Sequence, residues 1–170
     1  VDLVFHQAAQ VSVTRSIERP EESFSNNLAA TLNILEQARN KDFRVVLASS
    51  CAIYGDPKET PISESDKKYP QSPYGLEKLT VDRYARLYHE IYNTETVALR
   101  YFNVYGPRQS GGDYSGVISI FKQQAENDQS LTVEGDGKQT RDFVHVDDVV
   151  RANLLAAETD HVGAAYNVGT

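Results

Sequence analysis

The sequence has 170 residues, a length that suits one domain, or most of one, with a hydrophobic core. Its net charge of −7 argues against a nucleic-acid-binding surface, which is normally basic, and no apolar run is long enough to span a membrane. The four histidines lack the spacing of metal ligands, so we expect no metal site. The one cysteine, Cys51, excludes an intrachain disulfide and favours a reducing, cytoplasmic compartment.

Strand-like and helix-like segments alternate along the chain. Apolar runs predict buried strands at 1–9, 43–50 and 96–106, and shorter strands at 130–135 and 164–169. Helical periodicity predicts helices at 21–40, 74–92, 117–128 and 146–158, and we expect loops at 10–20 and 55–73. This alternation indicates an α/β fold, a doubly wound parallel sheet covered on both faces, in which ligands bind at the carboxyl ends of the strands.

The spacing Tyr-x-x-x-Lys occurs twice, in "YGDPK" (Tyr54 and Lys58) and in "YGLEK" (Tyr74 and Lys78). Side chains four residues apart meet only on a helix. Gly55 and Pro57 make the first copy a turn, whereas a long helical pattern follows the second. We therefore expect only Tyr74 and Lys78 to lie one above the other.

A tyrosine acting as a general base at neutral pH needs roughly 4 kcal/mol of preferential stabilisation of its phenolate. A lysine one helical turn away is one source of that stabilisation, and Ser50, at the end of a neighbouring strand, offers a hydroxyl to the reacting oxygen. The alternative is that Tyr74 and Lys78 occupy a solvated helix face and that Ser49 and Ser50 only end a strand. Residue pattern alone leaves both interpretations open.

Five motifs, in order, resemble the extended short-chain dehydrogenase/reductases, and within them the nucleotide-sugar 4-epimerases of the UDP-glucose and UDP-N-acetylglucosamine type. The motifs are "HQAA", "SS-x-x-x-YG", "SPYGLEK", "RYFNVYGPRQ" and "GDGKQTRDFVHVDDVV". The resemblance implies a partial Rossmann-like doubly wound sheet with a small substrate-binding α/β portion. On this pattern, 1–105 is the C-terminal part of the NAD-binding domain, 106–145 is part of the sugar-nucleotide-binding domain, and 146–170 returns to the Rossmann sheet.

The resemblance also implies the roles of individual residues. Tyr74 is the expected base for the sugar O4, Lys78 binds the nicotinamide ribose and lowers the pKa of Tyr74, and Ser50 binds O4. The positions expected to contact NAD are His6, Ala8, Ala9, Asn27, Ser49, Tyr74, Lys78 and Tyr101. Those expected to contact the UDP-sugar are Ser50, Asn103, Arg108 and Arg141.

Several of these residues also have ordinary structural interpretations. Asn27 could pack within its helix, and Arg141 could form a surface ion pair with Asp142. Arg108, which follows Gly-Pro in a loop, is the weaker phosphate candidate. Family members commonly pair through helices that correspond here to about 22–39 and 74–92, so a homodimer is expected.

Three departures from the family pattern bear on the function. Related dehydratases and decarboxylases carry acidic residues after the strand-ending serine, where this chain has Cys51 and Ala52, and this favours epimerisation. Glu134 stands where many relatives have an aromatic residue near the base, which weakens the assignment of the base, although uridine is still the expected one. The glycine-rich pyrophosphate turn, which in the family precedes residue 1, is absent, as is any methionine, so we expect a fragment of a longer reading frame that binds NAD poorly by itself.

The resemblance is also compatible with other functions. A UDP-glucuronate 4-epimerase and a 4-keto-sugar nucleotide reductase are the neighbouring enzymes, and a reductase would consume NADH or NADPH. A non-catalytic Rossmann module is the alternative from another class, although such modules typically lose the tyrosine or the lysine.

Overall fold

A computed structural model describes residues 1–109, 116–133 and 135–170. Its main sheet is entirely parallel, in the order β1-β2-β3-β6, with strands at Leu3–His6, Arg44–Ser50, Thr96–Tyr101 and Ala164–Val168. The register pairs Ser50 with Tyr101 and Tyr101 with Val168, so the carboxyl ends of three strands lie level at one edge. A second pair of parallel strands, β4 (Asn103–Tyr105) and β5 (Phe143–His145), extends beyond that edge.

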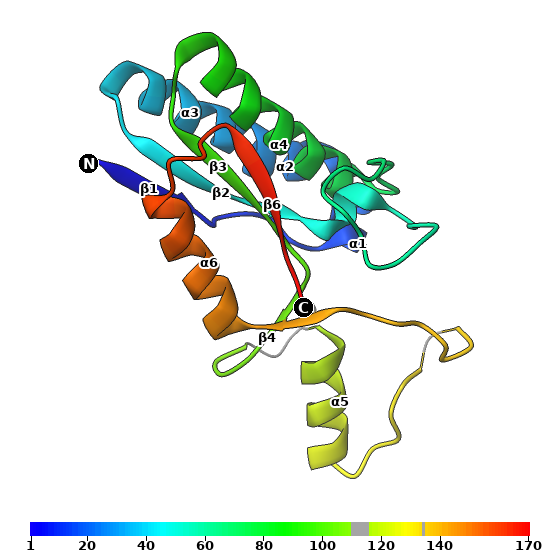
Figure 1. Cartoon of the computed structure of the whole chain (residues 1–170). Helices are drawn as coiled ribbons and strands as arrows, with labels where there is room; N and C mark the ends of the chain where they lie inside the picture. The colour runs from blue at the N-terminus through cyan, green and yellow to red at the C-terminus, as the bar shows by residue number, and fades with distance from the viewer. Residues whose placement is uncertain (110–115, 134) are drawn as a thin grey trace.

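Helices cover both faces of the main sheet (Figure 1). On one face, α3 (Ala30–Lys41) and α4 (Pro73–Tyr92) pack Leu35, Val81 and Ala85 against Val45 and Leu47 of β2. On the other face, α6 (Val146–Glu158) packs Val149 and Ala156 against β2, β3 and β6. Alternate residues of β2 therefore enter two separate cores, as a strand buried on both faces requires. The predicted α/β fold is confirmed, and it is Rossmann-like.

The predicted helix at 21–40 is a helical run with an internal π turn. It comprises α2 (Pro20–Phe24), the π-helical segment η1 (Ser25–Ala29) and α3. The loop expected at 10–20 is partly wrong, since α1 occupies Val13–Glu18. The side chain of Ser12 caps α1 by accepting a hydrogen bond from the Arg15 amide at 3.1 Å.

The strand predicted at 96–106 is two strands. At Phe102 the backbone changes partners: the Phe102 amide donates to Val168 O, and the Asn103 amide donates to Asp142 O, each at 3.1 Å. The short β5 was not predicted. A strand at 130–135 is wrong for the described residues there, 130–133 and 135, because Thr132 pairs instead with the side chain of Gln124.

The remaining helices are α5 (Val117–Glu126), which has no buried residue, and the short 3-10 helix η2 (Cys51–Tyr54). Among the described residues, no helix is both long and apolar enough to cross a membrane. Within those same ranges, no three His, Cys, Asp or Glu side chains gather closely enough to hold a metal ion.

Candidate active site

Helix α4 carries the tyrosine and the lysine of the "SPYGLEK" segment. Ser72 caps the helix by accepting a hydrogen bond from the Gly75 amide at 3.1 Å, and Pro73 occupies the first turn, where its missing N–H costs nothing. Lys78 Nζ lies 5.9 Å from the centre of the Tyr74 ring. The two side chains thus lie one above the other, as predicted. Only 9% of Tyr74 and 5% of Lys78 is exposed, which excludes the alternative of a solvated helix face.

Burial shifts the pKa values of both groups towards their neutral forms. It lowers the pKa of Lys78 to about 8, against a weaker opposite effect of the Glu77 and Asp82 carboxylates. Burial also raises the pKa of Tyr74, and the nearby Ser50 side chain offsets only part of that shift. The lowering of the Tyr74 pKa that we expected from Lys78 is therefore not found in the protein alone, because desolvation of the phenolate dominates.

Two serines join the end of β2 to the first turns of α4. The Ser50 side chain lies near enough to Tyr74 to influence its pKa, and its oxygen accepts from the Ala52 amide at 3.2 Å, which caps η2. The Ser49 hydroxyl, which is buried, donates to the Lys78 carbonyl at 3.5 Å. Ser50, Tyr74 and Lys78 are thus brought together at the carboxyl edge of the sheet.

Gly75 allows the two elements to approach this closely. A Cβ atom at this position would lie 2.8 Å from the Ala52 carbonyl oxygen, closer than real Cβ contacts. The residue after Tyr74 is therefore a glycine for a steric reason, and the spacing between η2 and α4 depends on it.

His6 lies behind this site, at the end of β1. Its Nε2 atom is 3.0 Å from the Thr31 hydroxyl, which itself donates to the Asn27 carbonyl at 2.6 Å. Because the threonine hydrogen is already used, Nε2 of His6 is the donor in this contact. Burial, followed by the charge of Lys78, lowers the pKa of His6, which favours the neutral ring.

Asn27 holds the loop that follows β1. Its side chain accepts from the Gln10 amide at 2.7 Å and donates to the Gln10 carbonyl at 3.0 Å. The same amide group donates to the buried Glu77 carboxylate at 2.7 Å, and Ser23 donates to that carboxylate at 2.8 Å. The Asn27 side chain is therefore occupied within the protein, and the structure makes it a support for the loop at 7–12; contact with a cofactor stays a prediction.

The other predicted cofactor residues lie in two places. Ala8, which is exposed, and Ala9, which is half-buried, are in the loop that Asn27 supports. Tyr101 packs on the α6 face of the sheet, away from Tyr74, and its hydroxyl meets Gln7 Oε1 and Asn153 Oδ1 at 3.0 Å each. The structure does not bring the Tyr101 hydroxyl to the Ser50–Tyr74–Lys78 group.

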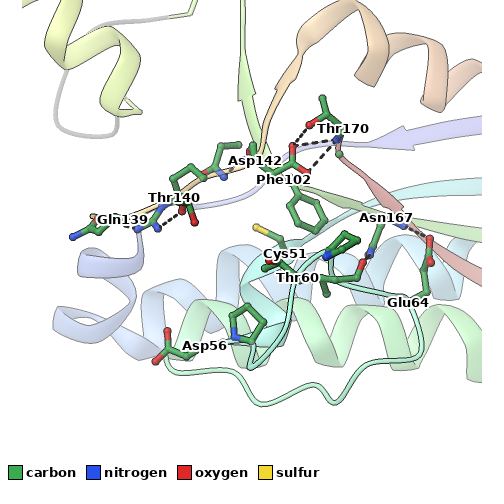
Figure 2. Close-up of a pocket in the computed structure, with 17 residues that line it drawn as sticks. Cys51, Asp56, Thr60, Glu64, Phe102, Gln139, Thr140, Asp142, Asn167 and Thr170 are labelled. Atoms are coloured by element: carbon green, nitrogen blue, oxygen red, sulfur yellow. Dashed lines mark hydrogen bonds between the residues drawn. The ribbon is translucent and has the colours of Figure 1, made fainter. Parts of the chain in front are cut away.

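A cavity of about 1020 Å³ opens beside Cys51, the residue that follows Ser50 (Figure 2). Its walls come from the loop after η2, from the start of β4, from the segment before β5 and from the end of β6. Two of the four predicted substrate residues, Asn103 and Arg141, line it. The other two do not: Ser50 adjoins the lining through Cys51, and Arg108 is exposed. The full lining is Cys51, Gly55, Asp56, Pro57, Thr60, Pro61, Ile62, Glu64, Phe102, Asn103, Gln139, Thr140, Arg141, Asp142, Asn167, Gly169 and Thr170.

The two predicted substrate residues in the cavity differ in their exposure and in the hydrogen bonds that they already make. Asn103 donates its side-chain N–H to the Asp142 carbonyl at 2.8 Å, so part of its hydrogen-bonding capacity fixes β4 to β5. Arg141 is exposed and donates to the Thr140 carbonyl at 2.9 Å and to Gln139 Oε1 at 3.2 Å. The surface ion pair that we considered between Arg141 and Asp142 is absent from the ion pairs of the described residues.

Sequence reasoning missed three residues that shape the cavity: Phe102, Asp142 and Thr170. The Asp142 carboxylate accepts from the Thr170 amide at 3.1 Å and from its hydroxyl at 2.9 Å (Figure 2). Gly169 permits this contact, because a Cβ there would lie 2.6 Å from Asp142 Oδ2. Phe102 and Asp142 belong to motifs already quoted, "RYFN" and "TRDF". Their place in the cavity, however, depends on contacts between residues far apart in the sequence. Glu134 lies outside the described residues.

The family model for the NAD dependent epimerase/dehydratase family matches residues 1–169 of this chain. The chain belongs to that family. Its members named below are nucleotide-sugar enzymes.

The similar proteins agree on fold and on substrate class. A Methanocaldococcus jannaschii protein assigned as a UDP-glucose 4-epimerase is 45% identical over 100% of the chain. The UDP-N-acetylglucosamine 4-epimerase structure from Methanobrevibacter ruminantium M1, in complex with UDP-N-acetylmuramic acid, superposes with a TM-score of 0.95 at 39% identity over 99% of the chain. The UDP-glucuronic acid 4-epimerase from Bacillus cereus, in complex with UDP-glucuronic acid and NAD, gives 0.90 at 34% identity over 99%.

The family is also chemically diverse, and the chain is shorter than its relatives. A UDP-N-acetyl-alpha-D-glucosaminuronate decarboxylase from Bacillus cytotoxicus is 35% identical over 99% of the chain. The chain spans 56% of the Methanocaldococcus jannaschii protein, 55% and 54% of the two superposed structures, and thus about half of each relative.

The residues around Lys78 fit the ribose of NAD, the cofactor of this family. The ammonium has three N–H donors, and in the described part of the chain one of them meets the Ala48 carbonyl, at 2.8 Å. Two donors are therefore left for the vicinal diol of the ribose. Such hydrogen bonds would stabilise the ammonium, whose charged form burial disfavours.

Proposed function

We propose that the whole protein is a nucleotide-sugar 4-epimerase that acts on a UDP-hexose or a UDP-N-acetylhexosamine with NAD retained through the cycle. The observation that carries this proposal is the Ser50–Tyr74–Lys78 group at the carboxyl edge of the sheet, beside a cavity whose adjoining residue is Cys51 rather than an acid. Ser50, Tyr74 and Lys78 are the proposed catalytic residues.

The chemistry divides between the cofactor and three side chains. Bound NAD would supply the acceptor, and later the donor, for the hydride of the sugar C4. Tyr74 takes the O4 proton as that hydride leaves and gives it back at the end of the cycle, and Ser50 holds O4 by a hydrogen bond. Lys78 binds the ribose and supplies positive charge one helical turn from Tyr74.

The raised pKa of Tyr74 in the protein alone supports a base that is switched on by its ligands. Its main cause is burial, and without added positive charge Tyr74 stays protonated at neutral pH. The positive charge of an oxidised nicotinamide and a Lys78 ammonium freed to face the ribose both favour the phenolate. Activation of Tyr74 therefore depends on the loaded site.

The residues after Ser50 argue against elimination and decarboxylation. These reactions move protons at other positions of the sugar and need an added acid. Cys51 lines the cavity, but burial raises the pKa of its thiol, so it remains protonated and is a poor acid or base. Ala52 has no polar group. Epimerisation needs only the hydride and the O4 proton, which the three proposed residues and NAD supply.

We place the UDP-sugar in the cavity beside Cys51. Its volume of about 1020 Å³ is large enough for a nucleotide sugar. Arg141 offers the diphosphate a planar fork of donors, and Asn103 is the second polar contact. Arg108 is not part of this proposal, since it does not line the cavity. Residues 1–105 and 146–170 would then form the cofactor side, and residues 106–145 part of the sugar-nucleotide side.

A second candidate is a UDP-glucuronate 4-epimerase, favoured by the 34% identity with the Bacillus cereus enzyme. The test incubates the purified whole protein with UDP-glucose, UDP-N-acetylglucosamine and UDP-glucuronate, without added reductant, and separates the sugar nucleotides by chromatography. We expect a fixed ratio of 4-epimers from one of the first two, and none from a Tyr74→Phe control.

Each other outcome of this assay identifies a different function. Conversion of UDP-glucuronate alone would select the second candidate. Conversion that requires NADH or NADPH would indicate a reductase. Retained NAD without turnover of any of the three would indicate a non-catalytic module and would contradict the proposal.

We also propose a homodimer through α4 and the helical run formed by α2, η1 and α3. Large apolar side chains are exposed on these helices, among them Phe24 (50%), Leu76 (57%) and Ile91 (63%). Large apolar side chains that stay exposed on packed helices are consistent with an interface. Light scattering should give twice the monomer mass, and Ile91→Asp should shift the whole protein towards monomer.

A further inference from the structure

The first Tyr-x-x-x-Lys tyrosine, Tyr54, has a different environment from Tyr74. Only 2% of Tyr54 is exposed, and its hydroxyl both accepts and donates. It accepts from Arg100 Nη1 at 2.8 Å and donates to Asn167 Oδ1 at 2.7 Å. Burial raises the pKa of Tyr54 despite the nearby Arg100 charge, so its hydroxyl stays a donor. Tyr54 is therefore a linker between two strands, β3 and β6.

These contacts continue into the loop that follows η2. The Asn167 side chain donates to the Ile62 carbonyl at 3.0 Å, and the Asn167 amide donates to Glu64 Oε1 at 3.0 Å. Arg100 Nη1 also donates to the Glu64 carbonyl at 3.3 Å. The hydrogen bond from Asn167 lowers the pKa of Glu64, which keeps its carboxylate charged. The loop is thus held at two residues by side chains from the sheet.

The residues so held form one wall of the cavity (Figure 2). Thr60, Pro61, Ile62 and Glu64 line it from the loop, and Asn167 lines it from β6. No strand or helix runs through residues 55–72, so regular backbone pairing does not fix this wall. The side-chain contacts just described are what join it to β3 and β6.

The network is anchored by an ion pair that stability alone does not explain. Arg100 Nε donates to Asp82 Oδ2 at 2.7 Å, and the two side chains are only 9% and 3% exposed. Burying such a pair costs desolvation free energy that its attraction often fails to offset, and Asp82 Oδ1 has no hydrogen-bond partner among the described residues. The pair instead fixes the orientation of the Arg100 guanidinium, whose Nη1 donates to Tyr54 and to the Glu64 carbonyl.

We infer that Tyr54, Asp82, Arg100, Asn167 and Glu64, the Tyr54 network, position the loop wall of the ligand cavity and thereby set the affinity for the sugar nucleotide. The inference rests on the proposed function, because the ligand of the cavity is taken to be a UDP-sugar. In this arrangement Tyr54 and Glu64 are positioning residues. They act through the wall and take no part in proton transfer.

Glu64 gives the sharpest test, because it is exposed and its substitution leaves the core intact. In the whole protein, Glu64→Ala should raise KM for the UDP-sugar about tenfold, with kcat within about twofold, as the loss of one charge-assisted hydrogen bond predicts. Glu64→Gln keeps an oxygen that accepts from the Asn167 amide and should restore KM to within about twofold of wild type. An unchanged KM in the alanine variant, or no restoration by glutamine, would overturn the inference.

Tyr54→Phe tests the buried part of the network against a matched control. Tyr88→Phe also removes a tyrosine hydroxyl that donates, at 2.6 Å, to a carboxylate, that of Glu36, far from the cavity. Both variants should melt at a lower temperature, but only Tyr54→Phe should raise KM, by about tenfold. Equal KM values for the two variants would show that Tyr54 contributes to stability alone.

A binding measurement separates this inference from the proposed function. Calorimetry with UDP on the NAD-loaded whole protein should show the Kd rising about tenfold in Glu64→Ala, in step with KM. If that rise occurs in a protein that does not epimerise, the inference holds and the function fails. If the wild type epimerises and the Kd is unchanged, the function holds and the inference fails; no UDP binding by the wild type would overturn both.

Discussion

The two Tyr-Gly-x-x-Lys segments of this chain share a spacing and differ in almost every physical respect. Tyr74 and Lys78 lie one turn apart on α4 and are both buried. Tyr54 ends η2, Gly55 turns the chain away at a φ of 66°, and Lys58 is exposed in the loop beyond. The same four-residue separation therefore gives a stacked pair in one case and two unrelated side chains in the other.

The difference teaches that the hydrogen-bond partners of a tyrosine, rather than its motif, indicate its role. The Tyr54 hydroxyl is held between Arg100 and Asn167 and has both donor and acceptor satisfied. The Tyr74 hydroxyl has Ser50 as its neighbour at the edge where ligands enter such sheets. A satisfied hydroxyl supports structure, and one that faces a binding edge can exchange a proton.

The largest expected effect separates the two tyrosines by activity. Tyr74→Phe removes the proposed base and should lower kcat about a thousandfold, within the range typical of lost acid–base catalysis. Tyr54→Phe should leave kcat within about threefold and act on KM. Chromatographic epimerisation assays at saturating UDP-sugar measure both. A kcat loss of similar size in the two variants would remove the distinction drawn here.

The glycines that follow the two tyrosines provide the second test. Gly55 has a φ of 66°, and a Cβ there would lie 2.1 Å from the Tyr69 carbonyl, so Gly55→Ala should cost about 3 kcal/mol of unfolding free energy. Gly75 is helical, and its added Cβ would meet the Ala52 carbonyl at 2.8 Å, so Gly75→Ala should cost less in stability and more in kcat by displacing Ser50.

Urea unfolding of the two alanine variants checks this prediction, and the epimerisation assay accompanies it. A smaller loss of stability in Gly55→Ala than in Gly75→Ala would contradict the roles assigned to the two turns.

Local pattern predicted the regular part of the fold well. Apolar runs at 43–50 and 164–169 became β2 and β6, and the periodicity at 74–92 became α4 with Ser72 and Pro73 at its start. The choice of Tyr74 over Tyr54 for stacking with a lysine also followed from local chemistry, because Gly55 and Pro57 break a helix. These features depend on neighbours within one or two turns.

What the sequence did not reveal depends on long-range contacts. The change of partners at Phe102 requires β5 and β6, which follow it by some forty residues or more. Thr170 and Asp142 meet across the cavity, and Tyr54 meets Asn167, only because β6 lies beside β3. The raised pKa of Tyr74 was likewise missed, because burial depends on the whole fold and outweighs the neighbouring lysine.

Substitution of Lys78 should show that the charge of this side chain serves function and lowers the free energy of unfolding. Its pKa falls from 10.5 to about 8 on folding, which corresponds to a cost on the order of 3 kcal/mol for keeping the ammonium charged at neutral pH. Lys78→Met removes that cost and leaves the Ala48 carbonyl without this donor, so a net gain of about 1–2 kcal/mol is expected at pH 7. Urea unfolding measures the gain, and the same variant should lack epimerase activity.

The pH dependence of that gain has a defined sign. Between pH 8 and pH 10.5 the unfolded chain holds the Lys78 proton and the folded chain has lost it, so the stability of the wild type rises with pH in this window. The advantage of Lys78→Met should therefore shrink from pH 8 to pH 10.5. An advantage that stays constant would show that burial of the ammonium is not its origin.

The smallest expected effect belongs to the other lysine. Lys58 is exposed and makes no hydrogen bond or ion pair with the described residues, so Lys58→Met should change the unfolding free energy by less than about 0.5 kcal/mol and leave turnover unchanged. Its neighbours Pro57 and Thr60 line the cavity, which makes KM for the UDP-sugar the informative quantity. If Lys58→Met raised KM, and raised it by a larger factor at low salt, Lys58 would be a contact for the diphosphate. The first segment would then serve the ligand through its lysine as well as through Tyr54.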